Sequence, residues 1–353
     1  MAPRLLEKVS HAMPTGLRMM TTLPPRAAPD LRSSDPIPVE SRRVSVVIPA
    51  RNEVPSIWET VRTVRAQARP GVELEILVVD DGSDDGTPEV ARAAGARVIL
   101  MSPGGNPAAA RNRGAAESTG DPIIFLDADC TPAPGWLAAL LAAHDRGEGI
   151  VGGSLDLPPG LPASARCDYY CGWYLVHSGR PAGTVAHIPP PNLSVRRELF
   201  LQTSGFTERQ PFAYTNEERI WEGELQRAGH RLYFEPRARV YHHNRPGFRN
   251  LLKRNYRWAY TAIPAKAETG AARLAWLYRR PRLLIAASAP LALVHTVFIL
   301  GCWARAGALE PLWMSPAILA SRVSYAAGMA VGGWRWLAAR RGGGPASFAP
   351  RWQ

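Results

Sequence analysis

The sequence predicts an α/β fold built on a mostly parallel β-sheet and followed by apolar helices, and three observations lead to this prediction. Short apolar runs alternate with amphipathic stretches between Val44 and Asp127, which is the pattern of βαβ units with helices on both faces of a sheet. Two of the apolar runs stop on aspartates. Near the C-terminus, 21 consecutive residues contain no Asp, Glu, Lys or Arg.

Length and composition fit one large domain with an appendage. The chain has 353 residues, of which 46% are hydrophobic, so it can bury a sizeable core. The net charge of +12 comes almost entirely from arginine, which favours contact with nucleic acid, anionic lipid or a phosphorylated ligand. The sequence has no recognition-helix, zinc-finger or RNP pattern, so nucleic acid is not an expected partner. The four cysteines form no CxxC pair, which fits a reducing compartment.

The elements of the first half follow from apolar runs bounded by turn residues. We expect strands at the four apolar runs 44–50, 74–80, 96–100 and 123–127. We expect helices between these strands, at 54–69, from Thr87-Pro88 onward, and at 107–118. Residues 1–43, rich in Pro, Arg and Ser, are expected to be a disordered leader.

After residue 155 the regular alternation ends. Residues 156–192 form a region rich in Pro and Gly with aromatic patches. The later elements are expected to be helices near 195–203, 217–228 and 247–265 and a short strand at 231–236. The predicted parts are an α/β domain at 44–245, an amphipathic juxtamembrane region at 246–282, an apolar helical hairpin at 283–337 and a tail at 338–353.

The C-terminal apolar stretches predict membrane spans. Residues 283–303 are long enough to cross a hydrocarbon core of ~30 Å, and 312–334 are apolar except for Arg322. Arginines precede the first stretch and follow the second, whereas the loop between them carries only Arg305. The positive-inside rule then gives a transmembrane hairpin with both ends, and the α/β domain, in the cytoplasm. Buried core helices are the alternative.

Two strands are expected to end in acid at the same edge of the sheet. Asp80 and Asp81 follow one apolar run, and Asp127 and Asp129 follow another. Open parallel sheets bind ligands at the carboxyl ends of their strands. If 127–129 stays extended, its two carboxylates point to one face and suit Mg²⁺ or Mn²⁺, which would neutralise a diphosphate. The alternative is that one of the two aspartates caps the helix expected after Pro132.

The motifs of several other protein classes are absent from this sequence. The sequence has no GxxxxGK[ST], no GxGxxG after the first strand, no HExxH and no GxSxG, so a diphosphate would be held by metal and arginine instead of a P-loop. The run ILVVDD also opens receiver domains, which need a lysine at the end of a later strand. No lysine lies between Lys8 and Lys253, which excludes that class.

An ordered set of motifs between residue 44 and about residue 260 resembles the family 2 glycosyltransferases, which have the GT-A nucleotide-diphospho-sugar transferase fold. The motifs are PARNE (49–53), VDDGSDDGT (79–87), AAARNRGAAESTGD (108–121), FLDADC (125–130), NLSVRRELF (192–200), SGFTE (204–208), NEERIWEGELQRAG (216–229), FEPRARVYHH (234–243) and RNYRW (254–258). The resemblance implies an inverting transfer of a sugar from a nucleotide-diphosphate sugar, UDP- or GDP-linked, with a divalent metal, Mn²⁺ or Mg²⁺.

The resemblance also assigns residues to the donor site. The nucleotide pocket would be lined by Pro49, Ala50, Arg51, Asn52 and Glu53. Asp81 would bond the base, and Arg111 would lie near the nucleotide or diphosphate, with a solvated helix face as the alternative for Arg111. Asp127 would contact the ribose or the metal side, and Asp129 would bind the metal directly. His242 would add a metal or phosphate contact, or be structural.

An inverting transfer needs a base, which the family places in a Glu-Asp pair at the start of a helix. This chain has Glu217-Glu218, so a glutamate stands where the aspartate is expected. One methylene moves a carboxylate by more than ~1 Å, which matters for catalysis. We favour Glu218 as the base, with Glu217 as the alternative. The alternative is a structural role, in which the helix N-terminus stabilises the pair of acids.

Processive relatives carry Gln-x-x-Arg-Trp, and this chain has Arg254 at the glutamine position. This difference favours addition of a single sugar. Arg257 would contact the diphosphate and Trp258 the acceptor, unless the helix is only an interfacial amphipathic helix. The sequence therefore predicts a non-processive glycosyltransferase at the inner or cell membrane, with a cytoplasmic catalytic domain and a membrane lipid or lipid-linked acceptor. The rivals are an inactive nucleotide-sugar-binding or assembly protein and a sugar nucleotidyltransferase; the sequence predicts no oligomeric state.

Overall fold

A computed structural model describes residues 41–103, 105–209, 212, 215–269, 275–278 and 280–343. The predicted leader lies outside the described residues up to residue 40, and so does most of the predicted tail. Among the described residues, nine strands form one sheet in the order β3-β2-β1-β4-β8-β6-β9-β5, with β7 paired to β9. The strands are β1 (Arg42–Ala50), β2 (Val72–Asp80), β3 (Arg97–Leu100), β4 (Ile123–Leu126), β5 (Cys130–Pro132), β6 (Ile150–Asp156), β7 (Gly183–Val185), β8 (Asn192–Val195) and β9 (Leu232–His242).

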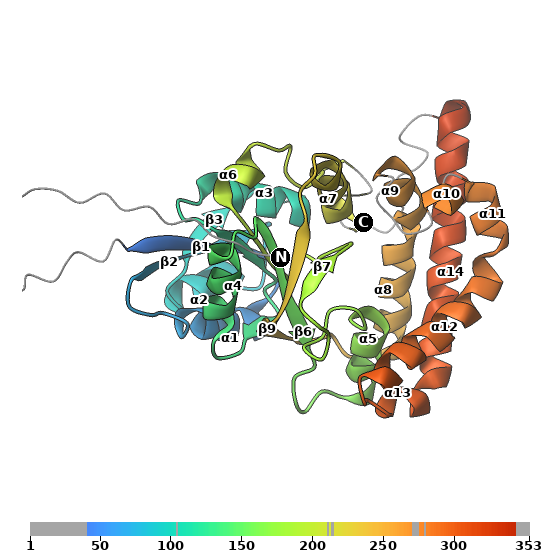
Figure 1. Ribbon diagram of the computed structural model, residues 1–353, viewed down its shortest axis with the longest axis horizontal. Coiled ribbons are helices and arrows are strands. Elements are labelled where there is room, and N and C mark those ends of the chain that lie inside the picture. Colours follow the sequence, from blue (N-terminus) through green and yellow to red (C-terminus); the bar gives the residue numbers. More distant parts are fainter. Residues whose placement is uncertain are drawn as a thin grey trace, which may run out of the picture. The chain divides into compact units, whose positions relative to one another are not determined.

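The first four strands are parallel and occupy one half of the sheet (Figure 1). The register pairs Ala50 of β1 with Asp80 of β2, and Val47 of β1 with Phe125 of β4. The three strands therefore end at the same edge. This half confirms the predicted βαβ units.

The other half of the sheet is mixed. β8 runs antiparallel to both β4 and β6, whereas β6 and β9 are parallel. β6 was not predicted because its sequence IVGGSLD contains two glycines, which weaken a strand on propensity alone. The fold needs both, since a Cβ on Gly152 would lie 2.4 Å from Ile188 and one on Gly153 would lie 2.1 Å from Asn192. The predicted strand 231–236 extends to His242 as β9.

Helices cover both faces of the sheet, as predicted. The helices of the α/β part are α1 (Val54–Arg65), α2 (Thr87–Ala93), α3 (Pro107–Glu117), α4 (Trp136–Asp145), α5 (Ala163–Gly172), α6 (Arg197–Leu201) and α7 (Glu217–Arg227). Alternate β1 residues pack into different clusters: Val46 and Ile48 with Ile57 of α1, and Val47 with Ala110 of α3. The strands are thus buried on both sides.

α3 is held close to the sheet and has a defined start. The Asn106 side chain caps it by accepting a hydrogen bond from the Ala109 N–H at 2.8 Å, and Pro107 stands in its first turn. A Cβ on Gly114 would lie only 2.3 Å from Val47. These constraints place Arg111 against the sheet edge.

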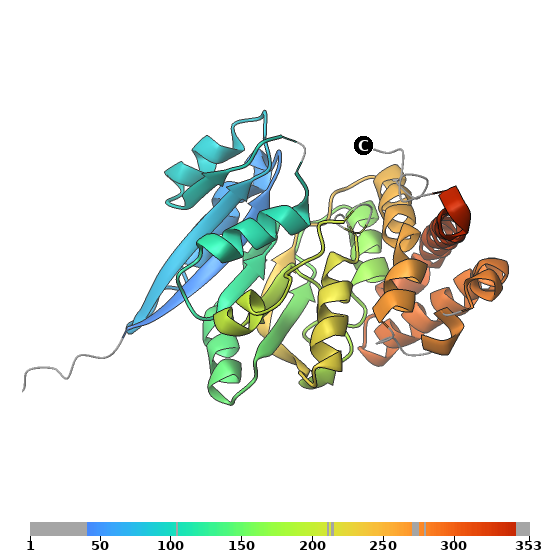
Figure 2. The same ribbon diagram turned by 90° about the horizontal axis from the view of Figure 1, so that it is seen from above.

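The remaining helices gather on one side of the sheet, as both views show (Figures 1 and 2). They are α8 (Phe248–Tyr260), α9 (Ala262–Thr269), α10 (Ala275–Tyr278), α11 (Pro281–Ala286), α12 (Ser288–Arg305), α13 (Glu310–Trp313), α14 (Ser315–Ala338) and a π-helical turn at Ala339–Gly343. The predicted helix 247–265 is therefore two helices that meet at Thr261. The first predicted span, 283–303, is likewise divided between α11 and α12.

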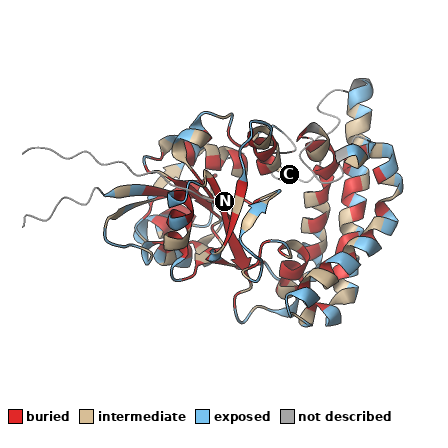
Figure 3. Cartoon of the chain, viewed as in Figure 1, coloured by how far each residue is buried: buried red, intermediate tan, exposed pale blue. Residues whose placement is uncertain are grey.

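Among the described residues, α12 is the one helix long and apolar enough to cross a membrane, with a mean hydropathy of 1.3 and 22% of its residues buried. The second predicted span corresponds mainly to α14, which packs along α8. Arg322 of α14 is buried in that contact, and its guanidinium donates to Asn255 of α8. Exposed residues remain along the outer side of these helices (Figure 3).

Candidate active site

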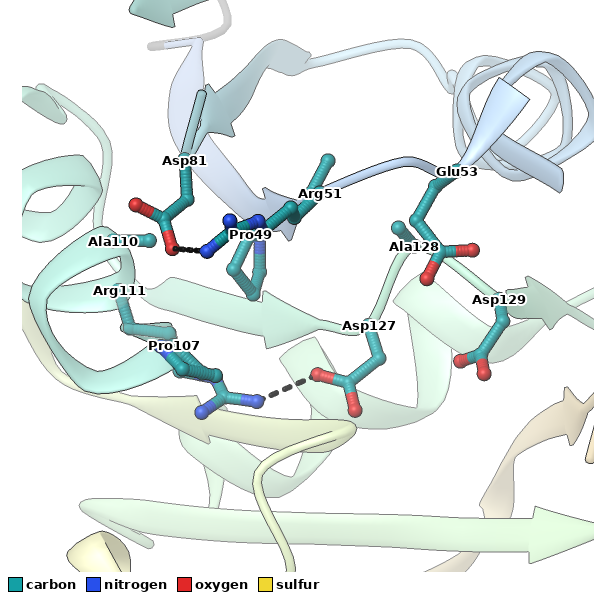
Figure 4. Close-up of a pocket in the computed structure, with 11 residues that line it drawn as sticks. Pro49, Arg51, Glu53, Asp81, Pro107, Ala110, Arg111, Asp127, Ala128 and Asp129 are labelled. Carbon is teal, nitrogen blue, oxygen red and sulfur yellow. Dashed lines mark hydrogen bonds and ion pairs between the residues drawn. The ribbon is translucent and has the colours of Figure 1, made fainter. Parts of the chain in front are cut away.

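The strand ends of β1, β2 and β4 surround a cavity of ≈ 240 Å³ (Figure 4). Its lining consists of Pro49, Ala50, Arg51, Glu53, Asp81, Pro107, Ala110, Arg111, Asp127, Ala128 and Asp129. The parallel register explains this convergence, because it brings the ends of β1, β2 and β4 to one edge. All residues predicted for the donor site line this cavity except Asn52, His242 and Arg257.

Asn52 joins two loops at the rim. It is exposed, with a left-handed backbone at φ 55°, a conformation that asparagine tolerates better than most residues. Its N–H donates to Ser83 Oγ at 2.9 Å, and its Oδ1 accepts from the Asp84 N–H at 3.0 Å. Asn52 therefore ties the loop after β1 to the loop after β2 and stands outside the cavity lining.

Asp81 forms the wall opposite Asp127 in the cavity. Its side chain is buried, and Arg51 Nη1 lies 3.7 Å from its Oδ2 (Figure 4). Burial raises the pKa of Asp81, and the nearby Arg51 charge opposes this rise. The carboxylate is thus a hydrogen-bond acceptor held in a poorly hydrated position.

Arg111 connects the two acidic groups of the site. Its Nη2 donates to Asp127 Oδ1 at 2.7 Å, and its Nη1 donates to Glu217 Oε1 at 2.7 Å. Burial lowers the pKa of Arg111, but the two carboxylates outweigh it and hold the pKa above its ordinary value. Arg111 is buried, so the alternative of a solvated helix face is wrong.

The segment carrying Asp127 and Asp129 is a turn and does not stay extended. The Cys130 N–H donates back to the Asp127 carbonyl at 3.1 Å, and Thr60 of α1 donates to the Ala128 carbonyl at 2.8 Å. The two carboxylates nevertheless point to the same side of the loop (Figure 4). Neither aspartate caps α4, whose N-cap is Gly135. The capping alternative is therefore wrong.

The Asp129 carboxylate has a histidine beside it. His242 Nε2 lies 3.8 Å from Asp129 Oδ1, and the possible ligand atoms of Asp129, Cys130 and His242 lie within 4.8 Å of one another. Burial and the nearby aspartates raise the pKa of the Cys130 thiol well above its ordinary value, so Cys130 stays a thiol and is a poor ligand.

A chain of hydrogen bonds sets the tautomer of His242. Asn244 Nδ2 donates to Asp168 Oδ2 at 3.0 Å, and since a carboxylate only accepts, the Asn244 Oδ1 must face His242. Asn244 Oδ1 lies 3.0 Å from His242 Nδ1, which therefore carries the proton. The Nε2 lone pair then faces Asp129. A carboxylate and an imidazole nitrogen so placed fit a divalent cation such as Mn²⁺.

A larger cavity of ≈ 1090 Å³ adjoins this donor-side cavity and shares Pro107, Arg111, Asp127 and Asp129 with it. The structure thus brings together residues that lie far apart in the sequence. The remaining predicted residues, Glu217, Glu218, His242, Arg257 and Trp258, all line the larger cavity.

Glu217 and Glu218 begin α7, and both are buried. Glu217 is engaged by Arg111, and burial together with Glu218 raises its pKa to about 8, against the Arg111 charge. Glu218 has a different neighbour, since its Oε1 lies 3.6 Å from His187 Nε2. Two adjacent carboxyls therefore have separate surroundings.

His187 and Glu222 were missed by sequence reasoning. His187 Nδ1 lies 2.8 Å from Glu222 Oε2, and Glu222 Oε1 accepts the Ile188 N–H at 2.8 Å. Burial raises the pKa of Glu222 to about 8 and lowers that of His187 to about 3. The i, i+4 spacing of Glu218 and Glu222 could have revealed the glutamate. Nothing local marks His187, which lies in the Pro/Gly-rich region.

The Arg254 side chain contacts other residues of the protein. Its guanidinium pairs with the buried Asp168 and lies 4.8 Å from the ring centroid of Trp258. Trp258 in turn packs edge-on against Trp173 at 5.7 Å. This face of α8 therefore faces the protein, whereas a helix serving only as an interfacial amphipathic helix would leave it to the membrane surface.

Comparison with known proteins finds one matching family model and several related sequences. A sequence model described as Glycosyl transferase family 2 matches residues 45–200. Glycosyltransferase AglE of Haloferax volcanii is 30% identical over 222 residues, which cover 61% of this chain and 71% of that protein. The undecaprenyl-phosphate 4-deoxy-4-formamido-L-arabinose transferase of Klebsiella pneumoniae is 40% identical over 118 residues, covering 31% of this chain and 36% of that protein.

A solved structure has a similar fold. It is a mannosyltransferase from Pyrobaculum calidifontis in complex with GDP-Man and Mn²⁺, with a TM-score of 0.54 and 23% identity over 85% of this chain and 88% of that chain. The pre-mycofactocin glycosyltransferase of Mycobacterium tuberculosis is 29% identical over 67% of this chain, which spans about half, 52%, of that relative.

Proposed function

The chain belongs to glycosyltransferase family 2, with the GT-A fold, and from this premise we propose that it moves a sugar with inversion from a nucleotide-diphosphate sugar to a membrane-associated acceptor. The observation that carries the proposal is the meeting of Asp81, Asp127 and Asp129 in one cavity at the strand ends, next to the buried pair Glu217-Glu218. A donor bound by the three aspartates would present its sugar toward the Glu217-Glu218 pair. The proposed donor is UDP- or GDP-linked.

The donor side is proposed to bind the nucleotide through the strand-end residues. Pro49, Ala50, Arg51 and Glu53 line the cavity beside Asp81, whose partly desolvated carboxylate would accept hydrogen bonds from the base. The complex of the Pyrobaculum mannosyltransferase with GDP-Man and Mn²⁺ supports a metal-bound nucleotide sugar as the class of donor.

Asp129 and His242 are the residues proposed to hold a divalent metal, Mn²⁺ or Mg²⁺, with Asp127 on the ribose or metal side. When bound, such an ion neutralises the departing diphosphate. Asn244 and Asp168 fix the His242 ring so that its Nε2 faces Asp129. Arg111 orients Asp127 through its hydrogen bond, and Arg257, which lines the larger cavity, would contact the diphosphate.

Glu218 is the proposed base. It would take the proton of the acceptor hydroxyl as the new bond to the anomeric carbon forms and the bond to the diphosphate breaks, so the carboxylate becomes a carboxylic acid. Glu217 is less suited because its Oε1 is already bonded to Arg111 at 2.7 Å. His187, 3.6 Å from Glu218, would position it.

Three observations support a membrane-associated acceptor and membrane localisation. The name of the Klebsiella relative gives undecaprenyl phosphate as part of its reaction. α12 carries exposed apolar residues, including Leu293 at 58% and Val297 at 62% exposed. α14 packs along α8, whose four cations keep α8 out of a hydrocarbon core. These features favour helices lying against the membrane, with the catalytic domain in the cytoplasm.

A donor survey tests the proposal. The full chain in detergent with Mn²⁺ or Mg²⁺ is offered a panel of UDP- and GDP-sugars, and release of the nucleotide is followed. We expect metal-dependent release from one donor, nearly abolished in Asp129→Asn and lowered ~10²–10⁴-fold in Glu218→Gln. Asp84→Asn, an exposed aspartate outside both cavities, is the matched control.

The same variants separate the rivals. An inactive nucleotide-sugar-binding protein would bind the donor without turnover and be indifferent to Glu218→Gln. A nucleotidyltransferase would consume nucleoside triphosphate and release pyrophosphate. Either result would overturn the proposed transfer. Glu217→Gln with a larger kinetic loss than Glu218→Gln, at equal stability, would reassign the base.

A further inference from the structure

The larger cavity continues past the acidic pair into the C-terminal helices. Beyond Glu218 it is lined by residues of α7, α8, α9, α11, α12 and α14. Two kinds of side chain share this extension. The cations Arg219, Lys266 and Arg322 line it together with aliphatic and aromatic groups of α11, α12 and α14.

Three cations from three different helices form no ion pair with any described residue, although the Arg219 charge acts on the Glu222 carboxyl and Lys266 donates to the Tyr278 hydroxyl at 3.1 Å. For Arg219 of α7, Lys266 of α9 and Arg322 of α14, no carboxylate of the described part of the chain lies within 4.0 Å. Arg322 is only 3% exposed and donates to neutral groups, Asn255 Oδ1 and Ser321 Oγ. A buried guanidinium without a counter-charge is costly, so this part of the cavity favours an anion.

Three of the nearby carboxylates are engaged by other arginines. Asp127 and Glu217 are both bonded to Arg111, and Asp168 pairs with Arg254. None of these three carboxylates therefore pairs with Arg219, Lys266 or Arg322. On the donor side, by contrast, carboxylates gather in the cavity.

The three cations lie within electrostatic reach of common neighbours. Burial first, and then the charges of Arg219 and Lys266, lower the pKa of His187, whose ring is 3.6 Å from Glu218. The Arg322 charge, and more weakly that of Arg219, opposes the rise that burial causes in the pKa of Tyr174. Arg219 and Lys266 therefore lie near His187, the neighbour of the proposed base, and Arg219 and Arg322 both act on Tyr174 in the same cavity.

The apolar part of the lining opens to the surface of the described helices. Leu284, Leu291 and Met329 lie inside, whereas Val294 and Phe298 are 62% and 50% exposed while also lining the cavity. A hydrocarbon chain could leave the cavity along this face of α12 and enter a membrane. A free anion would gain no binding energy from such apolar side chains.

We propose that the acceptor is a sugar carried on a lipid phosphate or diphosphate, with the phosphate bound by Arg219, Lys266 and Arg322 and the hydrocarbon chain along the apolar residues of α11, α12 and α14. This inference rests on the proposed function and names the class of its acceptor. A phosphate bound there would place the sugar that it carries beside Glu218, which takes the proton of the sugar hydroxyl as the new glycosidic bond forms. Charge complementarity and the apolar exit together select an anionic amphiphile over a neutral glycolipid.

A binding experiment on the full chain in nanodiscs tests the inference with farnesyl phosphate, farnesol and inorganic phosphate as probes. We expect farnesyl phosphate to bind at least about tenfold more tightly than farnesol, and Lys266→Gln and Arg219→Gln each to weaken it about tenfold, as for a lost charge-assisted hydrogen bond. Arg249→Gln, an exposed cation of α8 outside the cavity, should leave binding unchanged. Arg322→Gln should weaken binding where the variant folds; the other two variants carry the test if it does not.

Each other outcome overturns the inference. Equal affinity for farnesol, wild-type affinity in Lys266→Gln and Arg219→Gln, or no saturable binding would each exclude a lipid-phosphate site. Inorganic phosphate binding as tightly as farnesyl phosphate would show a free-anion site instead. Binding of UDP and GDP with Mn²⁺ is measured in the same samples: if a nucleotide binds but the lipid phosphate does not, the inference fails alone, whereas loss of both removes the proposed function as well.

Discussion

Arg111 Nη1 lies 2.7 Å from Glu217 Oε1, which joins α3 to the first residue of α7 across the centre of the site. The same guanidinium holds Asp127 at 2.7 Å through its other nitrogen. One buried side chain therefore connects the donor-side carboxylates to the acidic pair. The distance between the metal side and the proposed base depends on this arginine.

Replacing Arg111 by lysine or methionine should cost both stability and turnover. An ammonium group cannot span two carboxylates as a planar guanidinium does, and removing the cation leaves Glu217 buried without its partner. We expect Arg111→Met to lower the free energy of unfolding by about 3 kcal/mol or more, measured by urea denaturation. Arg113→Gln, on the exposed side of α3, is the control. Wild-type stability in Arg111→Met would show that the bridge is dispensable.

The pair His187 and Glu222 should produce a loss of stability above neutral pH. The pKa of buried Glu222 is raised from 4.5 to about 8 and that of His187 is lowered from 6.5 to about 3. Between pH ~4.5 and ~6.5 the folded pair and the unfolded pair each bind about one proton, so stability is level there. Above pH ~6.5 the folded state binds more protons, and stability falls as pH rises toward 8, by about 2 kcal/mol.

Chemical denaturation between pH 5 and 8.5 measures this effect. Glu222→Gln should reduce the fall above pH 6.5 by about 2 kcal/mol, because the amide does not titrate, while the fall caused by Glu217, whose pKa is also raised to about 8, remains. Arg219 and Glu218 lie near the same pair and are present in both proteins, so their effect on stability should be the same in both. An identical pH profile for Glu222→Gln and the wild type would contradict the assignment.

His187→Ala should lower the rate constant of transfer more than it changes the KM for donor.

The contact between α8 and α14 depends on two glycines. A Cβ at Gly328 would lie 2.1 Å from the Tyr256 carbonyl oxygen, and one at Gly332 would lie 1.9 Å from that of Tyr260. Gly328→Ala should therefore push the helices apart and cost about 1–3 kcal/mol of stability, seen as a lower Tm. Gly301→Ala on α12, where the nearest atom is the flexible end of Arg305 at 3.5 Å, should be tolerated. A Tm unchanged in Gly328→Ala would mean that the two helices are not in contact.

Membrane attachment should depend on the exposed face of α12. Leu293→Glu combined with Val297→Glu places charges at residues that are 58% and 62% exposed, and should move the protein from the membrane fraction to the soluble fraction. Leu100→Glu, equally exposed at 61% on the edge strand β3, is the control. Alkaline carbonate should release the wild type if the helices lie on the membrane. Retention in the membrane would instead support the predicted transmembrane hairpin.

Prediction from sequence succeeded where the signal is local. The runs that form β1, β2, β3 and β4 are apolar, short and bounded by turn residues, and the structure places all four strands within a few residues of the prediction. The strand-end aspartates could be placed at one edge by the geometry of parallel sheets alone. β5, β6, β7 and β8 were missed because three or four residues, or a strand containing Gly-Gly, give too little periodicity to recognise.

The α/β alternation, the acidic strand ends and the family resemblance can thus be read from the amino-acid order, since each of these is carried by neighbouring residues or by ordered motifs. The tertiary structure alone decided that Arg111 meets Glu217 across 106 positions, that His187 stands beside Glu218, and that α14 packs on α8. Such contacts join residues far apart in the chain and depend on how helices and strands pack. No local pattern of hydrophobicity or charge encodes that packing.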